Sequence, residues 1–464
     1  MGPQPGTGPA VAAAELASEF VADLGRRQVR LRADGDQLRC SAPAGVLTDS
    51  LVAEIRARKT QILRYLRDRA TAAQRVPADG PLSVAQEQLW LHQRLDPLST
   101  AYNIPLAVGL RGPLRPPALR QAFATMTARH DPLRATYAAA SGRPYQRVSP
   151  VAAAPLPIVD LAGLPPAARD RSAAELVTAA ARRPFDLASE PAIHTILLRC
   201  GPQDHRLLIT RHHIGSDGWS FGLIANEISS GYGASITGRP ARLPPLACQY
   251  GDFVAWQRRA ADSAAAQDKL RAWRSRLERV PRTLGLAGPR LSTGPPGPAR
   301  TVRREIPGEL TAELRRAASQ ARTTVFVFLL TALGLTLASA ADRDEIVVGT
   351  PAAARVRPEF EPLIGCFATM LPLPLDFGGD PLLSEAVGRV HAVVADALAS
   401  QEIGLERAAG VLRPDRPVEP DAGSPPRRPD PAGSTPVSVA FALQNNLPAR
   451  VDLPGIAALQ DAGP

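Results

Sequence analysis

The spacing of hydrophobic residues along the chain first predicts a small mixed domain near the N-terminus. Residues 15–27 carry apolar side chains every four positions, as on one face of a helix. Residues 28–41 alternate apolar and polar side chains around a turn at Asp34-Gly35-Asp36, which is typical of a β-hairpin. Helical spacing returns after Thr48, a favourable N-cap residue. The pattern predicts a disordered leader over residues 1–14, an αββαα domain over residues 15–70 and a linker over residues 71–80.

From Leu82 onward, short apolar strands alternate with amphipathic helices, which predicts a larger α/β domain. Residues 105–112, 193–199 and 206–213 have the pattern of strands, and residues 118–130 have that of a helix. A Pro/Gly-rich stretch then divides the domain into two halves of similar pattern. In the second half, an apolar helix is accompanied by the strand-like segments "VRREIP", "EIVVGTP" and "PVSVAFALQNN". We expect a first lobe over residues 81–284, an interlobe loop over residues 285–300 and a second lobe over residues 301–464, with a long loop over residues 413–436.

One segment, residues 323–341, is uncharged and nearly long enough to cross a bilayer. It contains several Thr, Ser and Gly residues, lies between charged flanks and runs into a predicted strand. No other segment suggests a membrane, so we expect a buried core helix.

Charge and cysteine content exclude several classes of protein. The formal net charge is +10, but the arginines are scattered and aromatic residues make up only 5%, so we expect no nucleic-acid partner. The four cysteines are far apart and show no metal-binding spacing, which indicates a reduced protein without a metal site. The first residues lack the features of a signal peptide, so we expect a cytoplasmic location.

The candidate chemistry lies in "TRHHIGSDGWS", residues 210–220, directly after a predicted strand. A metal site is disfavoured because adjacent strand residues point to opposite faces. A partner for a serine or cysteine nucleophile is disfavoured because no GxSxG-type element occurs. Two interpretations stay open: two histidines that only support a strand end, or one inward histidine and one that acts as a base or orients an attacking group.

The wider sequence resembles condensation domains of nonribosomal peptide synthetases, whose signature is HHxxxDG. The accompanying family motifs occur in order along the chain. They are "LSVAQEQLWLHQRLDPLSTAYNIP", "RHDPLRATY", "RHHIGSDGWS", "YGDFVAWQ", "IGCFATMLPL", "QEIGLERA" and "PVSVAFALQN". The resemblance implies an α/β fold of two chloramphenicol-acetyltransferase-like lobes in a V, with the histidine motif where they meet. It also implies amide formation between a donor acyl or peptidyl thioester and an acceptor aminoacyl thioester, each delivered on a peptidyl carrier protein.

The same resemblance assigns roles to individual residues. His213 matches the histidine that orients or deprotonates the acceptor amine, and His212 is expected to face inward. Asp217 matches the aspartate that forms a structural salt bridge, here with Arg355, and Gly218 would let the backbone approach the thioester closely. Two arginines of the second motif, Arg129 and Arg134, are expected to be mainly structural.

The small N-terminal domain resembles tubulysin-type (TubC) N-terminal docking domains of megasynthase subunits, through "GDQLRCSAPAGVLT" and "IRARKTQIL". In that family the hairpin binds the C-terminal tail of the upstream subunit, often an acidic one. Arg30, Arg32 and Arg39 would lie on the outward hairpin face and pair with its carboxylates. The alternative is that these arginines only solvate an exposed face.

The sequence also departs from the condensation family. Ala368-Thr369-Met370 stands where the fifth motif usually has Val-Asn-Thr, and the second lobe is expected to be incomplete because the sequence stops after "LPGIAALQDAGP". No adenylation motif or carrier site occurs, so the chain is expected to bind no cofactor and to act on substrates carried on the 4'-phosphopantetheine of partner proteins. The alternatives are a noncatalytic docking scaffold and an acyltransferase that uses acyl-coenzyme A.

Overall fold

A computed structural model describes most of the chain. The described residues are 24, 29–34, 37–42, 47–63, 79–150, 155–241, 243–280, 284, 301–403, 437–444 and 450–460. The predicted leader, the interlobe loop over residues 285–300 and the proline-rich loop over residues 413–436 lie outside the described residues.

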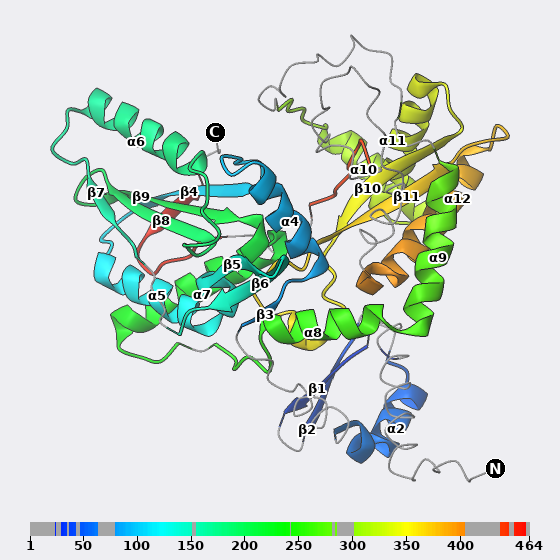
Figure 1. Ribbon diagram of the computed structural model, residues 1–464, viewed down its shortest axis with the longest axis horizontal. Coiled ribbons are helices and arrows are strands. Elements are labelled where there is room, and N and C mark those ends of the chain that lie inside the picture. The colour runs from blue at the N-terminus through cyan, green and yellow to red at the C-terminus, as the bar shows by residue number, and fades with distance from the viewer. Residues whose placement is uncertain are drawn as a thin grey trace.

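The described part of the N-terminal domain contains a hairpin and a capped helix (Figure 1). Strands β1 (Arg30–Asp34) and β2 (Gln37–Ser41) are antiparallel, and Asp34 pairs with Gln37 across the predicted turn. Helix α2 (Asp49–Ala57) begins after Thr48, whose side chain accepts a hydrogen bond from the Leu51 amide. The hairpin and the N-cap therefore form as the sequence pattern predicts. A small apolar core joins them, made of Leu24, Val29, Leu31, Leu51, Ile55 and Ile62.

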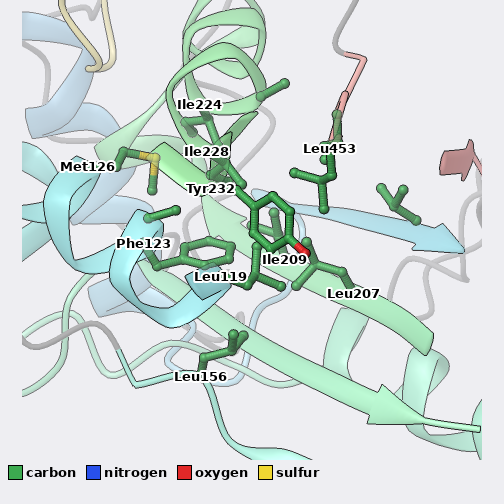
Figure 2. Close-up of a cluster of buried hydrophobic side chains, with 14 of the residues drawn as sticks. Leu119, Phe123, Met126, Leu156, Leu207, Ile209, Ile224, Ile228, Tyr232 and Leu453 are labelled. Carbon is green, nitrogen blue, oxygen red and sulfur yellow. The ribbon is translucent and has the colours of Figure 1, made fainter. Parts of the chain in front are cut away.

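The first lobe is built on a five-stranded sheet in the order β12-β4-β9-β8-β7 (Figure 1). Its strands are β12 (Ala457–Gln460), β4 (Asn103–Arg111), β9 (Asp204–His212), β8 (Ile193–Arg199) and β7 (Ile158–Asp160). Helices α5 (Pro116–Arg129) and α7 (Gly218–Thr237) pack on one face, and α6 (Pro166–Ala181) contacts the other. Figure 2 shows the core between the sheet and the two helices, where Phe123 of α5 and Ile228 of α7 lie over Ile209 of β9.

Further elements complete this lobe near the HHxxxDG motif. They are β3 (Gly80–Pro81), α4 (Val84–Leu95), η1 (Asp131–Arg134), β5 (Ala135–Ala140), β6 (Arg143–Val148), η2 (His213–Gly215) and α8 (Tyr250–Ala261). Strands β3, β6 and β5 form a separate small sheet. Helix α4 begins with a capping box between Ser83 and Gln86, and the Gln86 side chain also donates to the Ile214 carbonyl, 2.9 Å away. Helix α4 is thereby joined to the turn that carries the second histidine.

The second lobe contains the antiparallel pair β10 (Glu345–Ala352) and β11 (Thr369–Asp376). Around it lie α9 (Ala264–Arg279), α10 (Gly308–Gln320), α11 (Val325–Ala341), η3 (Pro358–Phe360), α12 (Leu383–Ala399) and η4 (Gln401–Ile403). The uncharged segment predicted as a core helix is α11, which begins after an N-cap at Thr324 and buries Leu330 and Thr331 completely. Among the described residues, no single helix meets the length and hydropathy required to cross a membrane; α10 and α11 do so only as a pair bent by 101°.

Two segments pack across the predicted division between the lobes. Helix α9 falls within the predicted first lobe, but Trp273 and Leu277 pack into the core of the second lobe. Conversely, the C-terminal residues predicted in the second lobe return to the first, where β12 pairs with β4 and Leu453 enters its core (Figure 2). An apolar helix face or strand can be buried in the core of either lobe. Its sequence pattern predicts that it is buried but not in which lobe.

Two predicted strands of the second half are absent from the described residues. Residues 301–307 form no regular structure, and Val302 is 79% exposed. Residues 437–441 make only one parallel bridge to β10, in which Gly349 donates to the Val439 carbonyl and accepts from the Phe441 amide. Short apolar segments of this kind become strands only when a neighbouring edge offers them a continuous partner.

Candidate active site

The two histidines of the motif occupy different structural positions. His212 ends β9 and is 1% exposed, and its Nδ1 accepts a hydrogen bond from the Ile214 amide at 3.1 Å. Its ring lies edge-on to Phe185, with the ring centroids 5.7 Å apart. Burial lowers the pKa of His212 to about 4, with smaller contributions from neighbouring imidazoles, so this ring is neutral near pH 7. His212 therefore faces inward.

His213 does not continue the strand, which corrects the argument from strand alternation. It begins the 3-10 turn η2, where its amide donates to the Tyr102 carbonyl at 2.9 Å. The turn passes so close to Ala192 that a Cβ on Gly215 would lie 2.8 Å from the Ala192 Cβ. Because the turn changes the direction of the chain, His213 is half-buried while His212 is buried.

The environment of His213 favours a neutral imidazole. Burial lowers the pKa of His213 below the usual value. The nearby Asp217 carboxylate and a hydrogen bond to the backbone of His213 itself oppose this effect, and the Arg211 guanidinium makes a smaller contribution in the direction of burial. A neutral imidazole can accept a proton or a hydrogen bond from an amine.

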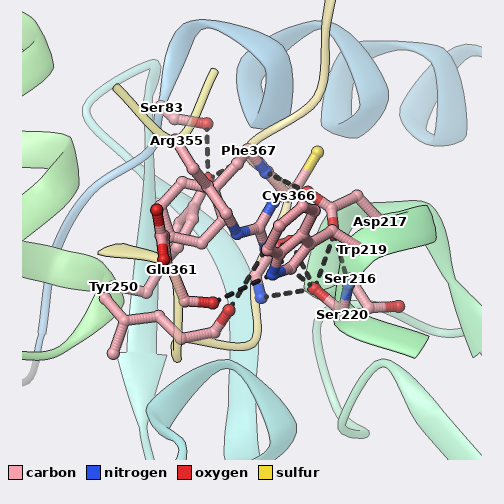
Figure 3. Close-up of polar contacts among 12 residues, drawn as sticks. Ser83, Ser216, Asp217, Trp219, Ser220, Tyr250, Arg355, Glu361, Cys366 and Phe367 are labelled. Carbon is pink, nitrogen blue, oxygen red and sulfur yellow. Dashed lines mark hydrogen bonds and ion pairs between the residues drawn. The ribbon is translucent and has the colours of Figure 1, made fainter. Parts of the chain in front are cut away.

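Asp217 is both the N-cap of α7 and one half of a buried ion pair, as Figure 3 shows. Its carboxylate accepts from the Ser220 amide at 2.8 Å, and from Arg355 Nη1 at 2.7 Å and Nη2 at 3.2 Å. It also accepts from the Phe367 amide at 3.1 Å. The two side chains of the ion pair are 1% and 3% exposed. The structure thus brings together the aspartate and the arginine that the resemblance pairs.

Electrostatics explain why this buried carboxylate stays charged. Burial alone would raise the pKa of Asp217, but the Arg355 guanidinium and the hydrogen bonds from Arg355 and Ser220 hold that pKa below its usual value. The Arg355 guanidinium in turn lies over the Phe367 ring, 4.0 Å from its centroid, and donates to the Leu363 carbonyl. The pair therefore anchors the start of α7 to the segment between β10 and β11.

Residues of that segment extend the network, and the sequence analysis missed their part in it. Ser220 Oγ accepts from the Gly365 amide at 3.1 Å, and the Tyr250 hydroxyl donates to the Cys366 carbonyl at 2.6 Å (Figure 3). Asp217 directly before a helix is an N-cap signal, but a serine three residues later is not part of a capping box, so this signal does not identify Ser220. No local signal identifies Gly365 or Tyr250, because their contact joins segments more than a hundred residues apart.

The remaining predicted residues lie in varied positions. Gly218 is exposed as the first residue of α7. Arg129 pairs with Glu227 of α7 at 3.1 Å, and Arg134 pairs with Asp131 at 2.6 Å, so both contact protein groups. In the docking hairpin, Arg39 is exposed and pairs across the ladder with Arg32, while Arg30 pairs with Ser41.

Within the described part of the chain, metal and thiol sites would be built from His, Cys, Asp and Glu residues. No group of three or more His, Cys, Asp or Glu residues there could hold a metal ion. The four cysteines are free, and Cys200, Cys248 and Cys366 are buried. The site consists of an imidazole, a buried ion pair and a capped helix start.

Family models match both parts of the chain. The TubC N-terminal docking domain matches residues 18–68, and the Condensation domain matches residues 78–419. The chain is 36% identical over 342 residues to phosphinothricin tripeptide synthetase PhsC of Streptomyces viridochromogenes, covering 73% of this chain and 31% of that protein. It is 34% identical over 395 residues to the probable non-canonical nonribosomal peptide synthetase CymA of Salinispora arenicola, covering 82% and 5%. The chain thus spans less than a third of these relatives.

Solved structures share the fold. The X-domain in its complex with OxyB from teicoplanin biosynthesis has a TM-score of 0.68 at 23% identity, covering 84% of this chain and 83% of that one. The first condensation domain of the CDA synthetase has a TM-score of 0.63 at 20% identity, covering 83% and 86%. The EpoB cyclization-docking bidomain from Sorangium cellulosum has a TM-score of 0.61 at 26% identity, covering 85% and 81%.

The two lobes have the chloramphenicol-acetyltransferase-like fold of these condensation-domain structures, and the Asp217–Arg355 ion pair joins the HHxxxDG motif to the segment between β10 and β11. More specifically, the chain belongs to the condensation-domain family, whose matched relatives are nonribosomal peptide synthetases, and it carries a TubC-type docking domain. Such a domain indicates association with other synthetase proteins.

Proposed function

We propose that this chain joins a donor acyl or peptidyl thioester to an acceptor aminoacyl thioester, each carried on the 4'-phosphopantetheine of a peptidyl carrier protein. The acceptor amine attacks the thioester carbonyl carbon, a C–N bond forms, and the C–S bond breaks. The thiolate takes up a proton and leaves as the donor carrier's thiol. His213 orients the amine and accepts its proton, and no covalent enzyme intermediate forms.

The observation that carries this proposal is the position of His213. Its ring is half-buried in a turn that is tied to α4 through Gln86 and lies beside the anchored Asp217. Such fixation supplies the orientation on which a reaction between two tethered substrates depends. A histidine that only supported a strand end would resemble His212, which is 1% exposed.

The partners follow from the same proposal. The docking hairpin binds the C-terminal tail of an upstream subunit, with Arg39 contributing positive charge on an exposed strand. The chain itself holds no cofactor, and the protein works in the cytoplasm with the other synthetase subunits. We assign Arg30 and Arg32, whose side chains lie outside the described part of the structure, to the same tail-binding role.

The test is product formation from loaded carriers. Donor and acceptor carriers are charged with a panel of aminoacyl groups, and the extended thioester is detected by mass spectrometry. We expect His213→Ala to lower the rate by about a hundredfold or more, and His391→Ala, which replaces a surface histidine of α12, to leave it unchanged.

Other outcomes identify the alternatives. Amide formation from acyl-coenzyme A without carriers would indicate an acyltransferase that uses free coenzyme A. Binding of an upstream tail without any turnover would indicate a docking scaffold. Wild-type rates for His213→Ala would remove the assigned role of this histidine.

A further inference from the structure

Arg211 is a buried cation next to the two histidines. It lies on β9 and is 2% exposed. Leu207 and Ile209, which share its face of the strand, pack in the first-lobe core. The guanidinium lies over the Phe221 ring of α7, 4.7 Å from its centroid. Arg211 is therefore enclosed between the strand and the start of the helix.

The charge of Arg211 has no direct counterion. Among the described residues, no carboxylate lies within 4.0 Å of its guanidinium, whereas Arg355 grips Asp217 at 2.7 Å. Its one hydrogen bond there runs from Nη1 to Ser216 Oγ at 3.2 Å, and its Nε is buried without a partner. Burial lowers the pKa of Arg211 to about 10, and Asp217 opposes this effect, so the group stays charged near pH 7. Burying a cation without a counterion costs desolvation free energy, which destabilises the fold and points to another role for the charge.

The hydrogen bond to Ser216 and the charge of Arg211 both act on His213. Ser216 accepts from Arg211, and the Ser216 amide donates to the His213 carbonyl at 3.3 Å, which closes the turn. The charges that act on the imidazole are Arg211 from β9 and Asp217 from the start of α7. Asp217 is already paired with Arg355, and on α4 His92 affects His212 instead. Among the described residues, Arg211 is thus a cation close to His213 that forms no ion pair with a carboxylate.

We propose that Arg211 is a positioning residue for His213: it holds the turn through Ser216, and its buried positive charge, which adds to the effect of burial, disfavours a second positive charge on the neighbouring imidazole that is to accept a proton from the acceptor amine. The second half of this statement rests on the proposed function. The charge effect itself does not, because it concerns only the protonation state of the ring.

The first experiment needs no substrate. NMR titration of the histidine rings in the full chain gives the midpoint of His213, assigned by its loss in His213→Ala. We expect a wild-type midpoint below about 6.5, and a rise of about half a pH unit or more in Arg211→Met. Arg211→Lys keeps the charge and should stay close to wild type, as should Arg206→Met, which removes a half-buried arginine from the same strand.

The second experiment measures condensation of loaded carriers against pH. In Arg211→Met the acid limb of the rate profile should move to higher pH by the same shift as the ring titration. Ser216→Ala, which removes the hydrogen bond but keeps the cation, should lower the rate without moving that limb. A purely structural role for Arg211 would lower the rate at every pH and leave the limb in place.

The results separate the two proposals. A wild-type midpoint at or above about 6.5, or no rise in Arg211→Met, overturns the charge effect even if condensation is confirmed. If Arg211→Met does not fold, Arg211→Gln takes its place and the same rise is required. If wild type fails to couple loaded carriers while the midpoints move as expected, the proposed function fails and the charge effect stands.

Discussion

The Asp217–Arg355 ion pair is buried, so forming it costs desolvation free energy, and it holds several elements in place. Both charges are removed from water, and the attraction offsets that cost only while both partners are present. The carboxylate also caps α7 and accepts from the Phe367 amide, so its loss would release several elements together. The pair therefore stabilises the geometry around His213 without touching a substrate.

Replacing Arg355 by alanine should destabilise the protein by about 3–5 kcal/mol, because it leaves Asp217 buried and unpaired. Urea unfolding measures this change. Arg276→Ala is the matched control, since Arg276 pairs with Asp396 at the surface with both side chains nearly half exposed, and its loss should cost less than about 1 kcal/mol. Equal costs for the two variants would show that the buried pair is not a major anchor.

His212 should make the fold sensitive to acid. Its folded pKa of about 4 lies below the value of roughly 6.5 in an unfolded chain, so the unfolded state binds more protons between these values. Stability is therefore complete above about pH 6.5 and falls as the pH drops toward 4. In His212→Phe, the loss of unfolding free energy between about pH 7 and pH 4.5 should be smaller by roughly 2–3 kcal/mol, as read from urea unfolding. An unchanged loss would mean that His212 does not titrate as expected.

Among the elements, the segment between β10 and β11 depends on one close contact. A Cβ on Gly365 would lie 2.2 Å from Tyr250 Cδ2, and the Tyr250 hydroxyl donates to the next residue's carbonyl. Both the glycine and the tyrosine are needed for the segment to reach Ser220 and Asp217. The segment therefore connects Tyr250 of α8 to Ser220 and Asp217 at the start of α7.

Gly365→Ala should therefore displace the segment, destabilise the protein by about 1–3 kcal/mol and slow condensation. Thermal unfolding and the carrier assay measure the two effects. Gly388→Ala is the control, because a Cβ at this position in α12 meets no atom within 4 Å and alanine favours a helix. A Gly365→Ala protein as stable and active as the control would contradict the contact.

For the molecule as a whole, the path of the chain ties its C-terminal residues to the first lobe. Strand β12 pairs with β4, and Val451, Leu453 and Ile456 belong to the core that α5 and α7 cover. Figure 2 shows Leu453 in this core. Helix α9, in turn, packs into the core of the second lobe. Each lobe thus contains a segment from the other half of the sequence.

Truncation after residue 449 should destabilise the first lobe by several kcal/mol, because it removes three buried apolar side chains and exposes the edge of β4. Hydrogen exchange of the β4 amides should increase more than that of β10. Removal of residues 461–464 alone, which retains β12, is the control and should leave exchange unchanged. Equal protection of β4 in both truncations would show that β12 is dispensable.

Much of the local structure could be predicted from residue patterns. The hairpin around Asp34, the N-cap Thr48 and the core helix α11 all depend on neighbours within a few positions, and the structure contains each of them. The prediction of a strand at "VRREIP" was wrong, because a short alternating segment forms a strand only beside a suitable sheet edge. Val302 of this segment is exposed. Among the site residues, the motif indicated Asp217 and Arg355, but not Ser220 or Gly365.

The order of residues alone was sufficient for the hairpin, the capped helices and the HHxxxDG motif, since periodicity, capping and turn chemistry act over one or two turns of the chain. Only the tertiary structure decided that α9 belongs to the second lobe, that β12 returns to the first, and that His213 leaves the strand in a turn. It also decided that Arg211 is buried without a carboxylate at ion-pair distance among the described residues. These outcomes depend on which distant surfaces meet when the chain closes on itself, and that information is shared among residues far apart in the sequence.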